Sequence, residues 1–231
     1  MAHTTLKEFL EAAARKRQVN TGAQPEYVKL LKDPPPPKQH TLDDAKKRLA
    51  HLLRTKCPGY SFTPEHVEAI GAYISHRVEG DAKKWFIVMG NFGSGKTFLF
   101  EVLSEWVALY NNTRKKRHQV ISVHDLKSKY KQIGDEAFNE WNARNVCIDD
   151  LGAESITKHF GEEEDIMRRF LEQRYNLRHK VTTDIITNLT MDELAQRYGG
   201  RIESRLNEVG VKMKIGASID AVDFRKQKSH E

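Results

Sequence analysis

The eight residues GNFGSGKT, at positions 90–97, are the most informative part of this 231-residue chain. They fit the pattern G-x-x-x-x-G-K-[ST], follow the apolar run 85–89, and precede a segment with apolar residues at helical spacing. A strand that leads through such a loop into a helix is the context in which this pattern binds phosphate. A loop that only turned the chain would need neither the lysine nor the threonine, so we predict a phosphate-binding loop.

The residue types of this loop match the chemistry of a nucleotide. Glycines let successive backbone N–H groups turn toward a phosphate, and the start of the following helix adds partial positive charge. Lys96 is expected to reach the β- and γ-phosphates, and Thr97 is expected to ligate magnesium. The predicted ligands are therefore ATP and Mg²⁺. The residues expected to hold the nucleotide are Gly90, Asn91, Phe92, Gly93, Ser94, Gly95, Lys96, Thr97 and Phe98.

A second motif, an apolar strand that ends in acid, covers residues 145–150. In a parallel sheet its first carboxylate, Asp149, would lie beside the magnesium, which makes Thr97 and Asp149 the expected metal ligands. Asp150 has two interpretations. It polarises the attacking water as a general base, or it caps the turn at Gly152.

Strands and helices alternate along the chain after residue 84. Apolar runs predict strands at 85–89, 120–123, 145–149, 181–187 and 211–215, with helices around 99–107 and 166–171 and two short helices before the last strand. The strand at 120–123 separates the two motifs, which indicates that the Asp149 strand is not adjacent in chain order to the strand before the loop. The pattern predicts an α/β fold, a three-layer P-loop NTPase of the AAA+ (ASCE) type with a parallel central sheet.

The first 40 residues differ from the rest. Apolar residues at Leu6, Phe9 and Leu10 predict a short helix, and four consecutive prolines at 34–37 form a stiff spacer. We therefore expect a small helical N-terminal extension with a Pro-rich linker at 1–40 and an ATPase domain at 41–231. Two helices are expected to lead into that domain, one from residue 42 and one capped by Thr63.

Composition narrows the function classes. The net charge of +6 favours a polyanionic partner but is also compatible with mere solubility. No apolar run approaches the roughly 20 residues that cross a bilayer, so no membrane association is expected. The N-terminus has no secretory pattern, which predicts a cytoplasmic location. The two cysteines, Cys57 and Cys147, support neither a disulfide framework nor a zinc site.

Three further stretches resemble helicase loaders of the DnaC/DnaI kind and the related transposition ATPase IstB. They are IDDLGAE at 148–154, ITNLT at 186–190 and YGGRIESRL at 198–206. The resemblance covers about residues 60–225, including the final Asp-Phe-Arg at 223–225, and excludes the first 40 residues. It implies an AAA+ ATPase that acts in DNA replication.

The resemblance assigns further site residues. Asn188 would sense the γ-phosphate; the alternative, without the resemblance, is that it only ends the strand. Ser-Arg-Leu at 204–206 resembles an arginine finger, so Arg205 would reach the γ-phosphate of a neighbouring subunit, and Arg201 shares its helix face. A solvated basic face is the alternative for both. Thr190 is better explained as a helix cap. The catalytic candidates are Lys96, Asp149, Asp150, Asn188, Arg201 and Arg205.

The implied partners are a replicative helicase, single-stranded DNA and further copies of the chain, joined through the arginine finger. Cations at 114–117 and 127–131 are candidates for DNA contact or solvated surface. Two features depart from AAA+ enzymes: Asp150 replaces a glutamate, and too few residues follow Val211 for a helical lid domain. We expect slow hydrolysis suited to a switch. The alternatives are an IstB-like transposition regulator that binds target DNA, a scaffold that binds ATP without hydrolysing it, and, less favoured, a small-molecule phosphotransferase.

Overall fold

The structure is a computed structural model, and its described residues fall into five ranges. These are 41–56, 62–78, 84–111, 117–153 and 162–216. The expected N-terminal extension at 1–40 and the Asp-Phe-Arg stretch at 223–225 lie outside them. The chain divides into two compact units. Unit 1 comprises Met1–Ala82 and Val102–Arg117, and unit 2 comprises Lys83–Glu101 and His118–Glu231.

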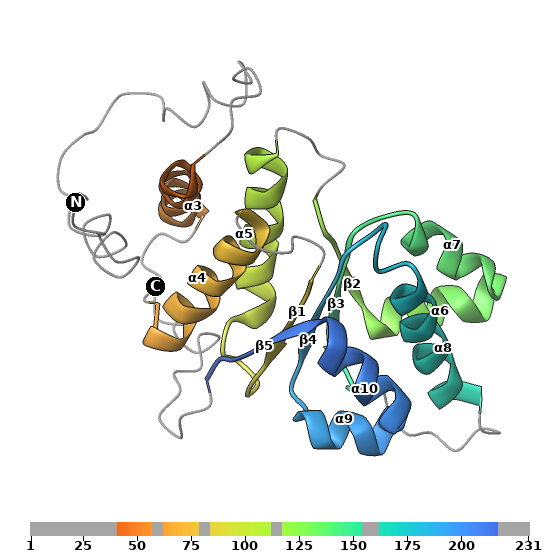
Figure 1. Ribbon diagram of the computed structural model, residues 1–231. Coiled ribbons are helices and arrows are strands. Elements are labelled where there is room, and N and C mark those ends of the chain that lie inside the picture. The colour runs from red at the N-terminus through yellow and green to blue at the C-terminus, as the bar shows by residue number, and fades with distance from the viewer. Residues whose placement is uncertain (1–40, 57–61, 79–83, 112–116, 154–161, 217–231) are drawn as a thin grey trace, which may run out of the picture. The chain divides into compact units, whose positions relative to one another are not determined.

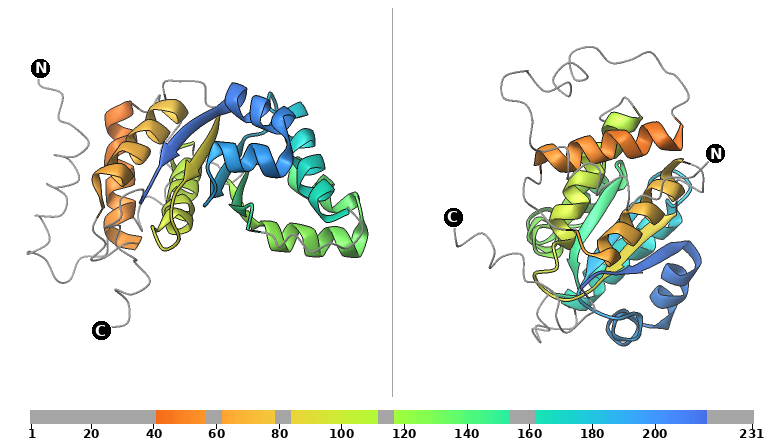
Figure 2. Two further views of the ribbon diagram at one scale, coloured as in Figure 1. Left: turned by 90° about the horizontal axis from the view of Figure 1, so that it is seen from below. Right: turned by 90° about the vertical axis from the view of Figure 1, so that its left-hand side faces the viewer.

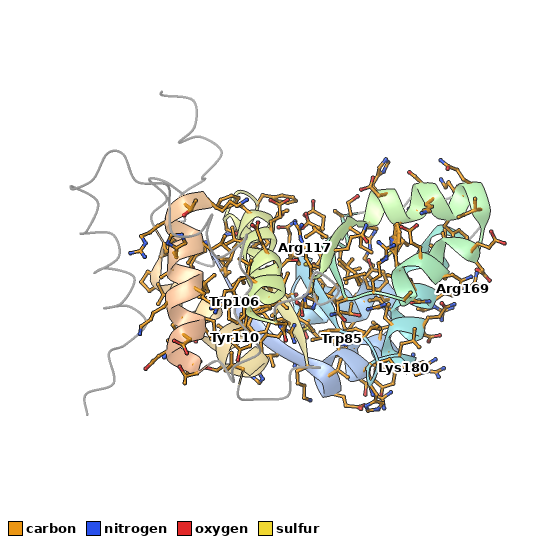
Figure 3. The ribbon with its side chains drawn as sticks, turned by 90° about the horizontal axis from the view of Figure 1, so that it is seen from above. Trp85, Trp106, Tyr110, Arg117, Arg169 and Lys180 are labelled. Carbon is orange, nitrogen blue, oxygen red and sulfur yellow. The ribbon has the colours of Figure 1, made fainter. Side chains whose placement is uncertain are left out.

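Unit 1 is helical where it is described. It contains α3 (Leu42–Lys56), α4 (Pro64–Val78) and the later part of α5 (Lys96–Tyr110). The indole of Trp106 is buried and donates a 3.0 Å hydrogen bond from Nε1 to the carbonyl of Ala45. The indole of Trp106 also meets the ring of Tyr73 edge-on and stacks on the ring of Tyr110. Figure 3 shows Trp106 beside Tyr110. Both helices expected before residue 84 are confirmed.

Unit 2 contains a five-stranded parallel sheet with the strand order β2-β3-β4-β1-β5. Its strands are β1 (Trp85–Met89), β2 (Gln119–Ser122), β3 (Val146–Leu151), β4 (Thr183–Thr187) and β5 (Gly210–Lys214). The expected parallel α/β fold is therefore confirmed. Strand β4 lies between the Asp149 strand β3 and β1 (Figure 1), an order that was not predicted from the sequence.

Five helices cover one face of this sheet in Figure 1 and in the left view of Figure 2. They are α6 (Val123–Ile133), α7 (Glu136–Asn142), α8 (Glu162–Asn176), α9 (Met191–Tyr198) and α10 (Gly200–Val209). Alternate residues of β1, such as Ile87, pack into the core beneath them. On the other face Phe86 is also buried and contacts Phe100 from the start of α5. Burial on both faces is the condition that parallel strands require.

Three details differ from the sequence prediction. Helices α6 and α7 were not predicted, and Val123 begins α6 rather than ending a strand. Ser122 explains this start, because its hydroxyl accepts a 3.0 Å hydrogen bond from the backbone N–H of Asp125. Strand β3 continues through Asp150 to Leu151.

Among the described helices, none has the length and apolar character needed to span a bilayer.

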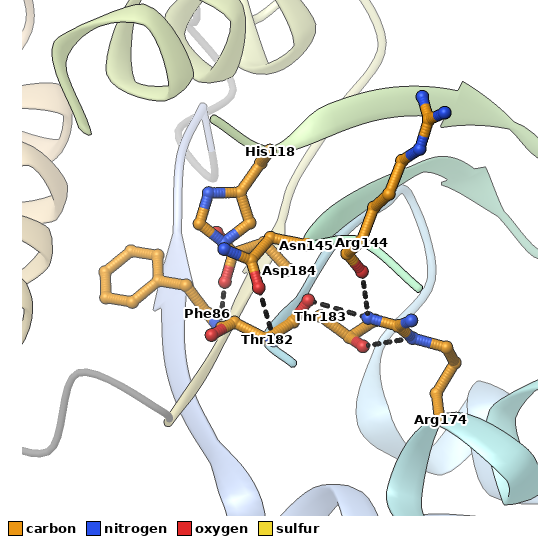
Figure 4. A network of polar contacts seen from close by, with 8 residues as sticks. All are labelled: Phe86, His118, Arg144, Asn145, Arg174, Thr182, Thr183 and Asp184. Atoms are coloured by element: carbon orange, nitrogen blue, oxygen red, sulfur yellow. Dashed lines mark hydrogen bonds and ion pairs between the residues drawn. The ribbon is translucent and has the colours of Figure 1, made fainter. Parts of the chain in front are cut away.

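A buried arginine ties together the amino ends of β3 and β4 (Figure 4). The guanidinium of Arg174 is fully buried and donates to Thr183 Oγ1 at 2.8 Å and to the carbonyls of Trp141, Arg144 and Thr182 at 2.8, 3.0 and 2.8 Å. Burial lowers the pKa of Arg174 to about 10, which leaves the side chain charged at neutral pH. The charge is therefore satisfied by four oxygen acceptors.

A second buried group joins β4 to its neighbours at the same end of the sheet (Figure 4). Asp184 accepts a 2.9 Å hydrogen bond from the backbone N–H of Phe86 in β1. Its other carboxylate oxygen lies 3.5 Å from Nε2 of His118, which precedes β2. Asn145 adds a 2.9 Å hydrogen bond from the backbone N–H of Thr182 to its side-chain oxygen. These contacts hold β4 in register with its neighbouring strands at the amino end of the sheet, opposite the carboxyl end.

Candidate active site

The phosphate-binding loop has the backbone that its glycines allow. It joins the end of β1 to the first residue of α5, Lys96. Gly93 and Gly95 have φ values of 77° and 80°, in the left-handed region that side chains disfavour. A Cβ on Gly90 would lie 1.7 Å from the carbonyl oxygen of Ile215, so this position admits no side chain. The motif glycines are therefore required by the loop's geometry.

Lys96 connects this loop to the end of β4. Its ammonium donates to the carbonyls of Gly90 and Asn91 at 2.8 and 2.7 Å and to Asn188 Oδ1 at 2.9 Å. The hydroxyl of Ser94 lies 3.3 Å away, and the lysine is only 5% exposed. All four acceptors are uncharged in this arrangement, and a phosphate would be a stronger acceptor for the same ammonium.

The two expected metal ligands are adjacent. The hydroxyl of Thr97 donates to Asp149 Oδ1 at 3.1 Å, and the backbone N–H of Asp150 donates to the same oxygen at 3.0 Å. The pKa of Asp149 is raised above its usual value, mainly by burial and also by the charge of Asp150. The hydrogen bonds from Thr97 and from the backbone of Asp150, together with the charge of Lys96, offset part of this rise. A hydroxyl and a carboxylate are oxygen ligands of the kind that Mg²⁺ prefers. The pair therefore fits the predicted magnesium site.

Asp150 lies at an irregularity in the sheet. The register pairs Ile148 with Ile185 and then Leu151 with Thr187, so β3 has one extra residue there. Asp150 has a φ of 57°, the only described non-glycine residue with a positive φ. Asp tolerates this region better than most residues. The bulge gives residue 150 a backbone conformation that a regular strand would not provide.

The side chain of Asp150 faces Asn188. Asn188 Nδ2 lies 3.4 Å from Asp150 Oδ1, while Asn188 Oδ1 accepts from Lys96. The turn after β3 is closed by the backbone instead, through a 2.9 Å hydrogen bond from the N–H of Ala153 to the carbonyl of Asp150. Asp150 is exposed, so water can reach its carboxylate. This geometry favours the general-base interpretation over the turn cap.

A hydrogen-bonded chain thus connects five of the predicted residues. It runs through Thr97, Asp149, Asp150, Asn188 and Lys96. These residues come from α5, β3 and the end of β4, which converge at the carboxyl end of the sheet. Ligands of open α/β sheets bind at this end.

Two other residues of the predicted loop site make less distinctive contacts. Phe92 is 70% exposed, and Phe98 is half-buried in the first turn of α5.

The two predicted arginines of α10 belong to a separate cluster with α8. Arg205 lies 3.3 Å from Glu172 Oε1 and 4.8 Å from the ring of Tyr175, with only 16% of its side chain exposed. Arg201 is 3.8 Å from the same carboxylate but 75% exposed. Arg201 therefore matches a solvated basic face. Arg205 is held by its own chain.

Tyr175 is the centre of this cluster and was not predicted. Its hydroxyl donates to Glu208 at 2.6 Å, which raises the pKa of Tyr175, and Arg178 lies 4.1 Å from its ring. Arg178 and Arg205 both contact this ring, and each has a glutamate nearby. Apart from the contact of Arg178 with Tyr175, these contacts join residues about 30 positions apart, so no local sequence signal could reveal them.

Thr190 caps α9 as expected. Its hydroxyl accepts from the backbone N–H of Glu193 at 3.3 Å, and the Glu193 carboxylate accepts from the backbone N–H of Thr190 at 2.7 Å. This is a complete capping box. It begins α9 at Met191, shortly after Asn188 in the chain.

The lysines proposed for DNA contact near Tyr130 are partly engaged within the chain. Lys127 is buried, and Lys129 pairs with Glu140 and lies 4.4 Å from the ring of Trp141. Tyr130 itself stacks on a core aromatic ring, which makes it a poor platform for a base. In the basic run at 114–117, only Arg117 is described, and it is exposed.

Comparison with known proteins identifies the fold. No protein-family model matches the chain, and no curated protein does. Among solved structures, the DnaC helicase loader aligns over 69% of this chain and 95% of its own, with 19% identity and a TM-score of 0.58. DnaI aligns over 71% of this chain and 88% of its own, with 22% identity and a TM-score of 0.51. This chain therefore has the α/β fold found in the DnaC helicase loader and DnaI.

Proposed function

We propose that this protein is an ATP-dependent replication factor that loads or regulates a replicative hexameric helicase on DNA. The observation that carries the proposal is the convergence of Lys96, Thr97, Asp149, Asp150 and Asn188 at one end of the sheet. The fold shared with the DnaC helicase loader and DnaI supports the choice of partner. A cytoplasmic location remains a prediction.

Each of the converging residues would have a separate role in ATP hydrolysis. Lys96 and Asn188 would hold the γ-phosphate, and Thr97 with Asp149 would hold Mg²⁺, which supplies charge neutralisation when bound. Asp150 would accept a proton as water attacks the γ-phosphorus. The bond from that phosphorus to the bridging oxygen of ADP then breaks, giving ADP and inorganic phosphate.

Slow turnover would suit this arrangement. The short carboxylate of Asp150 is exposed and contacts Asn188 at 3.4 Å, which is a weak hydrogen-bond distance. A loosely held base positions water less well, so ATP would act mainly as a switch ligand. The bound nucleotide would favour assembly, and hydrolysis would reverse it.

Arg205 would provide the link between nucleotide and assembly. In this structure Glu172 and Tyr175 hold it within its own chain. Release from Glu172 would free the guanidinium to reach the γ-phosphate of a neighbouring copy, where an arginine finger stabilises transition-state charge. Arg178 contacts the same tyrosine ring but lies outside the Ser-Arg-Leu motif, which makes it a matched control.

The test measures particle mass by light scattering for the chain mixed with a replicative helicase, with and without single-stranded DNA, in ATP or ADP. We expect a complex with helicase that requires ATP, is lost in Arg205→Ala and is retained in Arg178→Ala. A chain that binds no helicase in any nucleotide would contradict the loader function. ATP-dependent binding to duplex DNA and a transposase would identify a transposition regulator instead.

A further inference from the structure

We infer that the hydroxyl of Thr187 is a positioning group that holds Asp150 and Asn188 in register with the phosphate-binding loop. Thr187 is the last residue of β4 and is fully buried. The inference rests on the proposed ATP hydrolysis and assigns a role to a residue that touches no nucleotide group itself.

Thr187 contacts all three segments that form the site. Its hydroxyl donates to the carbonyl of Leu151 at 2.6 Å, directly after Asp150, and accepts from the backbone N–H of Leu189 at 3.0 Å, directly after Asn188. Its carbonyl accepts from the N–H of Gly90 at 3.2 Å. One residue therefore joins the bulge, the Asn188 segment and the first glycine of the loop.

The bulge makes this contact necessary. Where β3 gains its extra residue, regular pairing with β4 is interrupted between Ile148 and Leu151. Pairing resumes at Leu151 and Thr187, where the hydroxyl bond joins the strands. A positive φ at Asp150 persists only if the surrounding structure holds it. The Thr187 hydroxyl is the side-chain group that holds the strand end immediately after it.

Gly152 adds a steric contact to the same region. A Cβ at Gly152 would lie 2.3 Å from Cδ1 of Leu189, so the turn after β3 packs closely against the residue that Thr187 binds. Leu189 is thus held near the bulge by its side chain, which packs against Gly152, and by its backbone N–H, which binds the Thr187 hydroxyl. Movement of the bulge would be transmitted to the Asn188 segment.

Substitution by valine separates the hydroxyl bonds of Thr187 from its backbone bond to the phosphate-binding loop. Thr187→Val removes both hydroxyl bonds but keeps the side-chain shape and the backbone bond to Gly90. ATP affinity should therefore change less than about threefold. Loss of register between Asp150 and Asn188 should lower kcat by about 10- to 100-fold, because misplacement of about 1 Å has an effect of that size.

The control is a second buried threonine on the same strand. Thr183 is also fully buried, and its hydroxyl accepts from Arg174 at the opposite end of β4. Thr183→Val should lower the unfolding temperature but leave kcat within about threefold of wild type. Thr187→Ser restores a hydroxyl at the site and should recover most of the turnover.

A spectroscopic measurement keeps the test independent of turnover. In ¹⁵N-labelled protein, the side-chain amide resonance of Asn188 is assigned by its loss in Asn188→Asp. We expect Thr187→Val to shift or broaden it and Thr183→Val and Thr187→Ser to leave it in place. An unchanged resonance in Thr187→Val, or a changed resonance with wild-type kcat, would overturn the inference. If the wild type hydrolyses no ATP, the proposed function fails, and the resonance alone decides the role of Thr187.

Discussion

The two ends of β4 are built differently. At the amino end, the guanidinium of Arg174 satisfies four oxygen acceptors, and Asp184 accepts from the backbone of β1. At the carboxyl end, pairing with β3 is interrupted by a bulge, Asp150 has a left-handed backbone, and Asn188 joins two charged groups. Both ends carry polar groups, but the strand pairing with β3 is regular only at the amino end.

This difference separates stability from chemistry. A regular, fully satisfied network stabilises the fold because its removal would leave buried acceptors without donors. Irregular backbone and exposed carboxylates add little stability, but they place reactive groups where a ligand can reach them. We therefore expect substitutions at the amino end of β4 to reduce stability and those at the carboxyl end to reduce turnover.

The largest effect on stability should follow Arg174→Met. This change leaves four acceptors, three of them in buried contacts, without their donor and should lower the free energy of unfolding by about 3–5 kcal/mol. Urea denaturation measures the loss. Arg178→Met is the control, since Arg178 is a partly exposed residue of the same helix region and should cost less than about 1 kcal/mol. Equal losses in the two variants would contradict the role of the buried network.

Asp150→Asn should have a large effect on turnover at the other end. It keeps the size of the side chain and removes the base, so kcat should fall about 100-fold, the lower range for general-base catalysis. Unfolding in urea should be unchanged. Wild-type turnover in this variant would show that Asp150 is not the base.

A smaller effect should follow from relieving the left-handed backbone. Asp150→Gly should raise the free energy of unfolding relative to Asp150→Ala by about 1 kcal/mol, because glycine adopts a φ of 57° without steric cost. Both variants lack the carboxylate, so any difference between them reports the backbone alone. If Ala were as stable as Gly, residue 150 would not be left-handed in solution.

The smallest effect concerns the capping box that follows Asn188. Hydrogen bonds from the backbone N–H and hydroxyl of Thr190 lower the pKa of Glu193 below its usual 4.5. A lowered folded-state pKa means that the stabilisation is complete above about 4.5 and is lost as the pH falls through the folded value. Glu193→Gln should therefore be less stable than wild type at pH 7, and the gap should close as the pH falls through the lowered pKa of Glu193. A gap independent of pH would exclude this ionic contribution.

Local motifs predict much of the candidate site. The loop residues, Asp149 and the Thr190 cap were predictable because each depends on a few consecutive residues. The fold followed from the alternation of apolar strands and helices. Residues such as Asn188 and Arg205 required the resemblance to helicase loaders, and the role of Arg205 stays a prediction.

The missing parts depend on contacts between distant segments. The bonds of Thr187 and Arg174 join residues that only the folded sheet brings together, and no local pattern specifies a bulge in a parallel sheet. Helix α6 was the exception, because Ser122 followed by apolar residues at helical spacing was a readable signal. The bulge also gives a reason for Asp150 in place of glutamate, since Asp tolerates a left-handed backbone.

The most direct test of the account is Mg²⁺-dependent ATP turnover by wild type, Lys96→Ala and Lys84→Ala. Lys84 binds a backbone carbonyl of α10 and lies outside the site, so it controls for the loss of a lysine. We expect slow turnover by wild type and Lys84→Ala, and a loss of at least about 100-fold in Lys96→Ala, because its ammonium would stabilise the transferred phosphoryl group. Equal turnover in all three proteins, or none in wild type, would contradict an ATPase site at this loop.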